Sequence, residues 1–219
     1  MALSPDLTLD ELRIALAPAV ADAAVFDGWT ELAVTNAASL EGADPEVARF
    51  AFKGGAMTMI AAWIAATDRA MAGALPAEAL AGLKIRERIR RLVQFRLDAV
   101  IGQREALRRA LAIMAMPHNA VEALRLGWRS ADAMWRLAGD TATDYNHYTK
   151  RMTLGALYAS TLAVYAFDES EGLAETRGFL DRRIEDVMRF EKVKAQLVRP
   201  DADRFSVARF LGRLRYPAR

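Results

Sequence analysis

His118 and His147 are the only histidines in this chain of 219 residues, which contains no cysteine. A hydrolytic triad or a zinc site needs imidazoles placed together with suitable partners, and nothing in the sequence pairs these two. The di-iron sites of helical bundles need repeated Glu-x-x-His pairs, which Asp144 with His147 only approximates once. Without cysteine there is neither thiol catalysis nor a Cys-ligated metal. We therefore expect no metal site.

The glycine motifs of phosphate binding and of nucleophilic catalysis are also missing. The chain has no Walker-type loop, no G-x-S-x-G and no G-x-G-x-x-G. Lys53-Gly54-Gly55 is too short for a phosphate loop and follows a predicted helix. These absences predict a protein that is not an enzyme, with no catalytic residues and no cofactor.

The elements of the chain are all predicted to be helices. Alanine is abundant, β-branched residues are sparse, and apolar residues recur at three- and four-residue spacing. We expect helices over residues 8–25, 30–40, 45–52, 56–71, 84–102, 104–115, 117–138, 144–167 and 173–197. The fold class is therefore all-α. Because the connections between the long helices are short, we expect a bundle in which neighbouring helices are antiparallel.

Composition fits an ordinary folded domain. Apolar residues make up 53% and charged residues 26% of the chain, and at this length a core forms without disulfides. The sequence shows neither a signal peptide nor a run of about 18 apolar residues. We therefore expect a soluble or peripheral protein in a reducing or redox-indifferent compartment.

Charge is distributed unevenly along the chain. Residues 1–83 contain eleven acidic and four basic residues, whereas residues 84–109 contain three acidic and nine basic ones. We interpret the basic segment as the solvated outer face of amphipathic helices, whose long arginine stems also cover apolar surface.

The first three predicted helices resemble the helix-turn-helix end of TetR-type regulators. DNA binding would require lysine and arginine on the short helix that begins at Pro45. Asp44 and Glu46 lie in its first turn instead, within the acidic part of the chain. We expect no nucleic acid partner, although a TetR-type regulator that senses an apolar ligand remains the alternative function.

Residues 152–167 form a run of sixteen residues without a charge, too short to span a bilayer. A helix that is apolar on all sides lies at the centre of a bundle or lines a cavity. Small residues at Gly155, Ala156, Ala159 and Ser160 leave room on one side. Taken alone, each of the other large apolar candidates is more often ordinary core than pocket lining, since such residues are normally buried for packing. The candidate lipid-binding residues are Trp63, Phe95, Trp128, Trp135, Leu154, Tyr158 and Leu162.

The C-terminal segment is predicted to be a separate amphipathic helix after a linker that contains Pro200. Its apolar residues share one face, and its arginines suit anionic headgroups, as in an interfacial membrane helix. Packing on the protein's own bundle or on a second subunit is the alternative. The candidate membrane-binding residues are Phe205, Val207, Arg209, Phe210, Leu211, Arg213 and Leu214.

Residues 138–151, AGDTATDYNHYTKR, continued by LGALY at 154–158 and FLDRRIEDVM at 179–188, resemble the coenzyme Q (ubiquinone) biosynthesis accessory family of mitochondria and alphaproteobacteria. The resemblance covers about residues 29–194. It implies a TetR-like fold without DNA binding, a homodimer, an isoprenoid lipid or quinone intermediate in the C-terminal bundle, and a terminal helix at the membrane surface. It also implies a partner, the di-iron hydroxylase that acts on demethoxyubiquinone.

The family's partner-facing patch falls on Met134, His147 and Tyr148, where His147 replaces a tryptophan of mitochondrial members. Met134 and Tyr148 are expected as surface anchors. The implied domains are residues 1–55, helix-turn-helix-like; 56–197, ligand binding and dimerisation; and 198–219, linker and tail helix. The implied location is the inner face of a bacterial cell membrane, or the mitochondrial matrix side in a eukaryote. A purely structural dimer without a cavity is a third possibility.

Overall fold

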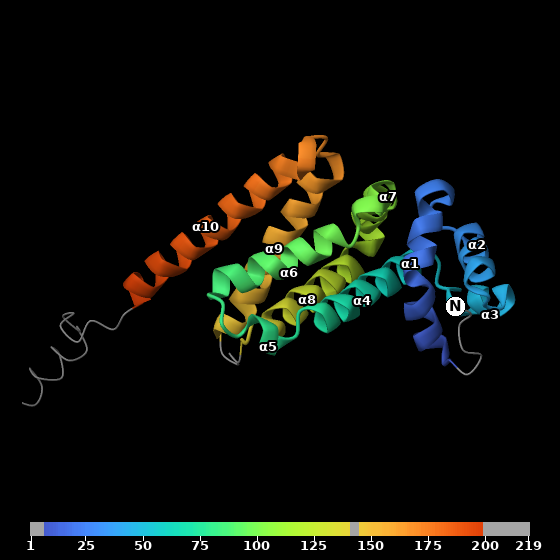
Figure 1. Cartoon of the computed structure of the whole chain (residues 1–219), viewed down its shortest axis with the longest axis horizontal. Helices are drawn as coiled ribbons and strands as arrows, with labels where there is room; N and C mark the ends of the chain where they lie inside the picture. The colour runs from blue at the N-terminus through green and yellow to red at the C-terminus, as the bar shows by residue number, and fades with distance from the viewer. Residues whose placement is uncertain (1–6, 141–144, 199–219) are drawn as a thin grey trace, which may run out of the picture. The chain divides into compact units, whose positions relative to one another are not determined.

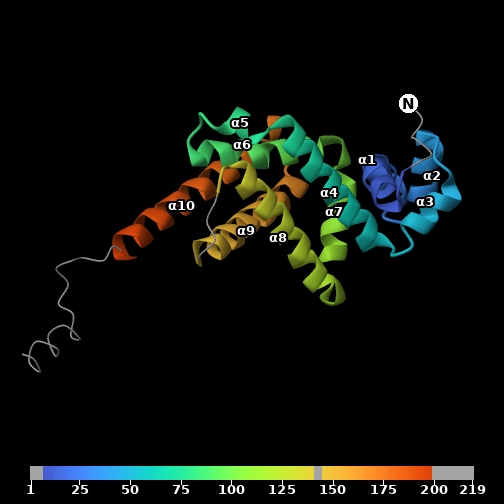
Figure 2. The same cartoon turned by 90° about the horizontal axis from the view of Figure 1, so that it is seen from below.

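The computed structural model describes residues 7–140 and 145–198 (Figures 1 and 2), and every regular element in these ranges is a helix. The chain divides into two compact units, Met1–Ile184 and Glu185–Arg219. The predicted three-part division at residues 55 and 197 stays a proposal about function. The α-helices are α1 (Leu9–Asp27), α2 (Glu31–Glu41), α3 (Pro45–Ala51), α4 (Ala56–Ala74), α5 (Ala77–Leu80), α6 (Ile85–Asp98), α7 (Arg104–Met114), α8 (Ala120–Leu137), α9 (Tyr145–Phe167) and α10 (Ala174–Val198).

The first three helices lie beside one another at one end of the first unit (blue in Figure 1). Thr8 and Glu11 form a capping box at the start of α1. Asp44 caps α3, and Pro45 occupies its first turn. Gly42 ends α2 in the left-handed conformation at φ 70°, which a residue without a Cβ adopts at little cost. Local sequence signals therefore set these boundaries, as predicted.

Helix α1 packs against α4 and α7, which joins the first three helices to the bundle of α4, α6, α7, α8 and α9. The indole of Trp29 is buried beside that of Trp63, with ring centroids 5.3 Å apart. Its Nε1 donates a hydrogen bond to the carbonyl oxygen of Ala106 in α7 at 2.9 Å. Both packing and a buried hydrogen bond thus fix the two parts of this unit to each other.

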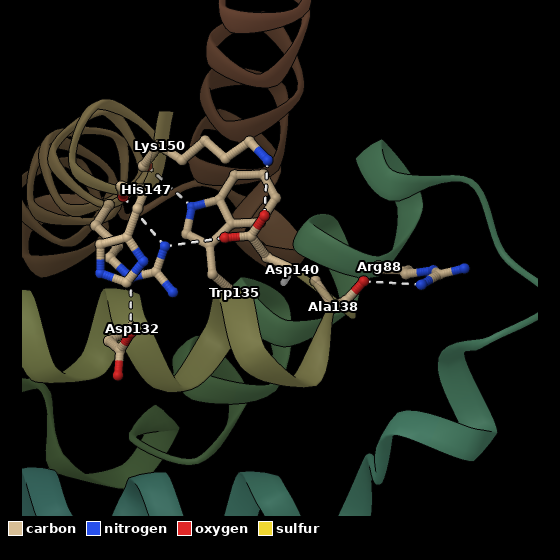
Figure 3. Close-up of polar contacts among 8 residues, drawn as sticks. Arg88, Asp132, Trp135, Ala138, Asp140, His147 and Lys150 are labelled. Atoms are coloured by element: carbon tan, nitrogen blue, oxygen red, sulfur yellow. Dashed lines mark hydrogen bonds and ion pairs between the residues drawn. The ribbon is translucent and has the colours of Figure 1, made fainter. Parts of the chain in front are cut away.

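The arginines of residues 84–109 are not simply a solvated face, so that interpretation is wrong for several of them. Arg96 is only 2% exposed. Arg88 donates to the carbonyl of Ala138 at 2.8 Å, beyond the end of α8 (Figure 3). Arg104 and Arg108 donate to carbonyls at the end of α9, those of Tyr165 at 3.1 Å and Ala166 at 2.6 Å. The last carbonyls of a helix lack intrahelical partners, and these guanidinium groups supply them.

The turn between α9 and α10 is organised by Asp168, whose side chain is buried. Its carboxylate accepts hydrogen bonds from the backbone N–H groups of Ser170 and Thr176, each at 2.8 Å, and from both hydroxyls. Burial alone would raise the pKa of Asp168, but these four donors hold it far below its ordinary value. The turn is therefore built around a buried carboxylate that stays ionised.

Candidate functional site

A cavity of about 720 Å³ lies among α4, α6, α7, α8 and α9. Its walls are mostly apolar, with polar groups at a few positions. It is lined by Ile60, Trp63, Ile64, Thr67, Arg96, Val100, Leu107, Ala110, Leu111, Met114, Ala115, Ala120, Ala123, Leu124, Leu126, Gly127, Trp128, Ser130, Arg151, Met152, Gly155, Ala156, Tyr158, Ala159 and Leu162. Both its size and its chemistry are typical of pockets that take small apolar ligands.

The small residues of α9 form part of the wall. Gly155, Ala156 and Ala159 line the cavity, as the sequence predicted for the uncharged run. Ser160 does not line it, and its hydroxyl donates to the carbonyl oxygen of Leu157 at 2.9 Å. Small side chains at these positions thus leave space beside the larger α9 residues that also line the cavity, Met152, Tyr158 and Leu162.

Two large apolar side chains that line the cavity, one on α8 and one on α9, are exposed to solvent. Leu124 on α8 and Met152 on α9 both line it, yet they are 76% and 64% exposed. Large apolar side chains left exposed at the rim of an apolar cavity are typical of a ligand entrance.

A buried ionic cluster forms one polar part of the wall. Arg96 on α6 pairs with Asp68 on α4, and its Nη2 donates to the Ser130 hydroxyl of α8 at 3.2 Å. The guanidinium carbon lies 4.8 Å from the ring centroid of Tyr158. Burial alone would lower the pKa of Arg96, but Tyr158 and Asp68 raise it above its ordinary value. The charge of Arg96 is therefore secured inside an apolar cavity.

Arg151 on α9 is the second buried arginine of the wall. Its Nε donates to Asp132 at 2.6 Å, and its Nη1 donates to Asp140 at 2.9 Å. Lys150 also reaches Asp140, at 2.7 Å, while its own carbonyl accepts a hydrogen bond from the Trp135 indole at 2.9 Å (Figure 3). These contacts tie the end of α8 to the start of α9.

Four of the seven predicted lipid-binding residues line the cavity, namely Trp63, Trp128, Tyr158 and Leu162. The other three do not belong to its lining. Trp135 is held against Lys150 beside the α8–α9 connection, and Leu154 is buried on another face of α9. Phe95 is half-buried beside Arg96, and it is the arginine that lines the cavity. Helical spacing identified apolar positions but could not say which of them border the space.

The predicted partner residues are not all at the surface. Tyr148 is 58% exposed, and its ring lies 5.2 Å from that of His147 and 6.0 Å from that of Trp128. Met134, in contrast, is completely buried, so the expectation of a surface anchor there is wrong. It lies on the face of α8 that carries Leu126, Ser130 and Ala131 into the core. The predicted membrane-binding residues Phe205, Val207, Arg209, Phe210, Leu211, Arg213 and Leu214 lie outside the described residues.

Sequence reasoning missed Arg96, Arg151 and Leu124. Arg96 follows Leu92 and Val93 at the four- and three-residue spacing of the buried face of α6, which was the available signal for a buried guanidinium. Arg151 stands similarly three residues before Leu154. A charged residue at a predicted core position of a helix means either that the buried face was assigned wrongly or that the charge belongs to a buried polar cluster.

In the part of the chain that the structure describes, no group of three or more His, Asp or Glu side chains could hold a metal ion. No single helix there is long and apolar enough to cross a membrane. Two consecutive helices, Pro45–Ala51 and Ala56–Ala74, are long and apolar enough only when they are taken together, and the chain bends by 94° between them.

The sequence has relatives among proteins of ubiquinone biosynthesis. The COQ9 family model matches residues 120–191. The human mitochondrial ubiquinone biosynthesis protein COQ9 is 40% identical over 100 residues, which are 46% of this chain and 31% of that protein. The Drosophila melanogaster mitochondrial COQ9 is 24% identical over 192 residues, which are 86% of this chain and 59% of that protein. The matched regions thus span from about a third to three fifths of these relatives.

The fold also has a counterpart among solved structures. The crystal structure of a TetR transcriptional regulator from Nitrosomonas europaea superimposes with a TM-score of 0.63 at 23% identity, covering 81% of this chain and 98% of that one. This likeness confirms the predicted all-α, TetR-like fold. The match to the COQ9 model spans α8, α9 and most of α10, the region on which the predicted resemblance rested. The chain is therefore similar in sequence to the COQ9 proteins over part of its length, and it has the fold of a TetR-type regulator.

Proposed function

We propose that this protein is a non-enzymatic accessory protein of ubiquinone biosynthesis. It binds an isoprenoid quinone intermediate and presents it to the membrane-associated di-iron hydroxylase that acts on demethoxyubiquinone. The observation that carries the proposal is the apolar cavity of about 720 Å³, two of whose walls, α8 and α9, lie in the region that matches COQ9.

The physical basis of binding is removal of apolar surface from water, which stabilises a complex by roughly 25 cal/mol per Å² before the costs of association. A cavity of this size holds a ring with the first part of a tail. The remainder of a long isoprenoid would pass the rim at Leu124 and Met152, which are already exposed and apolar.

Presentation to a partner is supported by the position of the opening. Tyr148 lies four residues before Met152, which is one turn of α9, so both side chains lie on the same side of the helix. Trp128 lines the cavity and contacts the Tyr148 ring, which connects the interior with the half-buried His147 and the exposed Tyr148. A hydroxylase bound at these two residues would meet the ligand where it leaves.

The remaining parts of the proposal concern assembly and location. The protein acts as a homodimer and docks on the membrane surface through its C-terminal segment. It lies at the inner face of the bacterial cell membrane, or on the matrix side if it is eukaryotic. The mitochondrial names of the eukaryotic relatives are consistent with the second location.

The test is to fill the cavity. Ala159→Phe adds a phenyl group to a lining residue of α9, and Ala163→Phe adds the same group four residues later, at an exposed position outside the lining. Both are produced in cells that make ubiquinone, and apolar molecules extracted from the purified proteins are identified by mass spectrometry. We expect the wild type and A163F to carry an isoprenoid quinone or a precursor, and A159F to carry several-fold less. Equal loading of the two variants, or a wild type without such a ligand, would contradict the proposal.

The alternative is a TetR-type regulator that senses an apolar ligand, and the structural likeness favours it. The short helix α3 argues against DNA binding. Its Arg49 is already paired with Glu46, and the exposed side chains on this helix include the apolar Val47 and Phe50. Specific, salt-dependent binding to genomic DNA fragments would establish the regulator instead.

A further inference from the structure

The hydrogen-bonding groups of the cavity wall divide into satisfied and unsatisfied ones. The Ser130 hydroxyl donates to Asp68 and accepts from Arg96, each at 3.2 Å. Thr67 donates to the carbonyl of Trp63 at 2.9 Å, and the Trp63 indole donates to Gln103 at 3.0 Å. The donors of these three side chains are therefore not available to a ligand.

The groups left over are donors. Within the described ranges, Trp128 Nε1 and Arg151 Nη2 have no hydrogen-bond partner. Tyr158 lies against Arg96, with the guanidinium carbon 4.8 Å from its ring centroid, and because a guanidinium can only donate, Arg96 offers no acceptor to the Tyr158 hydroxyl proton. A ligand that satisfies these groups must bring acceptor oxygens.

The charges of the wall are already balanced. Among the described residues, Arg96 and Arg151 are the only charged ones that line the cavity, and both are 2% exposed. Arg96 is paired with Asp68, and Arg151 is paired with Asp132 and Asp140. An anionic head group would have to compete with these carboxylates at close range in a medium of low dielectric constant, which is costly. The cavity is therefore suited to an uncharged ligand.

We propose that the cavity selects lipids by an uncharged ring that bears acceptor oxygens, such as a benzoquinone, and that Tyr158, positioned by Arg96, is the specificity-determining donor. This inference rests on the proposed function and adds the residues that recognise the ring and the reason why a charged head group is disfavoured. Tyr158 lies six residues beyond Met152 on α9, roughly 9 Å along the helix at 1.5 Å per residue. A ring held at Tyr158 thus lies farther along α9 than Met152, with the tail directed toward Met152.

Three probes with the same decyl chain test this. Decylubiquinone, decylbenzene and decyl phosphate compete with the neutral dye Nile red for the full-length protein, and displacement is followed by fluorescence. We expect decylubiquinone to bind more tightly than decylbenzene, and decyl phosphate to gain nothing over decylbenzene. Tyr158→Phe should lower the affinity for decylubiquinone by roughly fivefold, which corresponds to the loss of one buried hydrogen bond, and should leave the affinity for decylbenzene unchanged.

The matched control is Tyr165→Phe, which removes the same hydroxyl from a tyrosine of α9 that does not line the cavity, and which should change neither affinity. Preference for decyl phosphate, equal binding of decylubiquinone and decylbenzene by the wild type, or an unchanged preference in a folded Y158F would overturn this inference and leave lipid binding intact. If the wild type binds Nile red and none of the three probes displaces it, the proposed function fails as well.

Discussion

Arg96 shows how one residue can serve both stability and specificity. Its guanidinium is buried against Asp68, Ser130 and the ring of Tyr158, so it fixes α4, α6, α8 and α9 around the cavity. Burial raises the pKa of Asp68, although Arg96 and Ser130 act to lower it. The carboxylate therefore depends on Arg96 for its charge, and removing the arginine leaves a buried charge without compensation.

Arg96→Met should lower the free energy of unfolding by about 3 kcal/mol at pH 7. The loss should be smaller at pH 4, because Asp68 then takes up a proton in the folded state. The sign follows from a folded-state pKa that is raised: the stability linked to it is present at low pH and falls as pH rises through that pKa. Urea unfolding at both pH values measures the difference. Arg91→Met on the exposed side of α6 should cost less than about 0.5 kcal/mol, and an equal loss in both variants would refute the role of burial.

At the scale of elements, the capping and turn residues decide where helices stop and how they are joined. Asp168 is the clearest case, because one buried carboxylate accepts four hydrogen bonds and begins α10 after the end of α9. Arg104 donates to the carbonyl oxygen of the same residue, so α7 is fixed to this turn. The wall of the cavity formed by α9 is thus anchored at the C-terminal end of that helix.

Asp168→Asn should lower the free energy of unfolding at pH 7 by about 2 kcal/mol. Hydrogen bonds to a charged carboxylate are replaced by weaker ones to a neutral amide, and the amide NH2 group is a donor where a carboxylate oxygen accepted hydrogen bonds. The folded-state pKa of Asp168 is depressed, so its contribution is present above an unfolded pKa near the ordinary value and is lost as pH falls below it. Thermal unfolding between pH 6 and pH 3 should therefore show a smaller loss for the variant than for the wild type. Glu169→Gln at the neighbouring exposed position serves as control and should follow the wild type.

At the scale of the whole molecule, the proposed function divides the work between a folded body with a cavity and a C-terminal segment rich in arginine. Residues 197–219 contain six arginines and two aspartates, and the apolar residues among them share one predicted helical face. In this proposal the body supplies specificity for the ligand, and the segment supplies affinity for a surface with anionic lipids.

Deleting residues 203–219 should abolish sedimentation with vesicles that contain phosphatidylglycerol, because both the basic and the apolar contacts are removed. The midpoint of thermal unfolding of the body should not change. A milder variant, Phe210→Ser, should weaken vesicle binding by several-fold at the same ionic strength. Undiminished binding by the truncated protein would show that another surface contacts the membrane.

Much of the fold could be predicted from the sequence. The ends of α1, α2 and α3 are set by Thr8, Thr30, Asp44 and Gly42 through local hydrogen bonds and backbone geometry, which neighbours in the sequence determine. The uncharged run with small residues likewise predicted that α9 would border a cavity or lie at the centre of the bundle. The motif at residues 138–151 identified the relatives.

Only the tertiary structure decided which apolar residues border the cavity and which fill the core. Trp128 and Trp135 are seven residues apart on α8 and both contact α9, yet the first lines the cavity while the second packs on Lys150. The same packing buried Met134 and brought Asp68, Arg96 and Tyr158 together from three helices. Helical periodicity gives the face of a residue, whereas its neighbours across the bundle depend on how the helices pack.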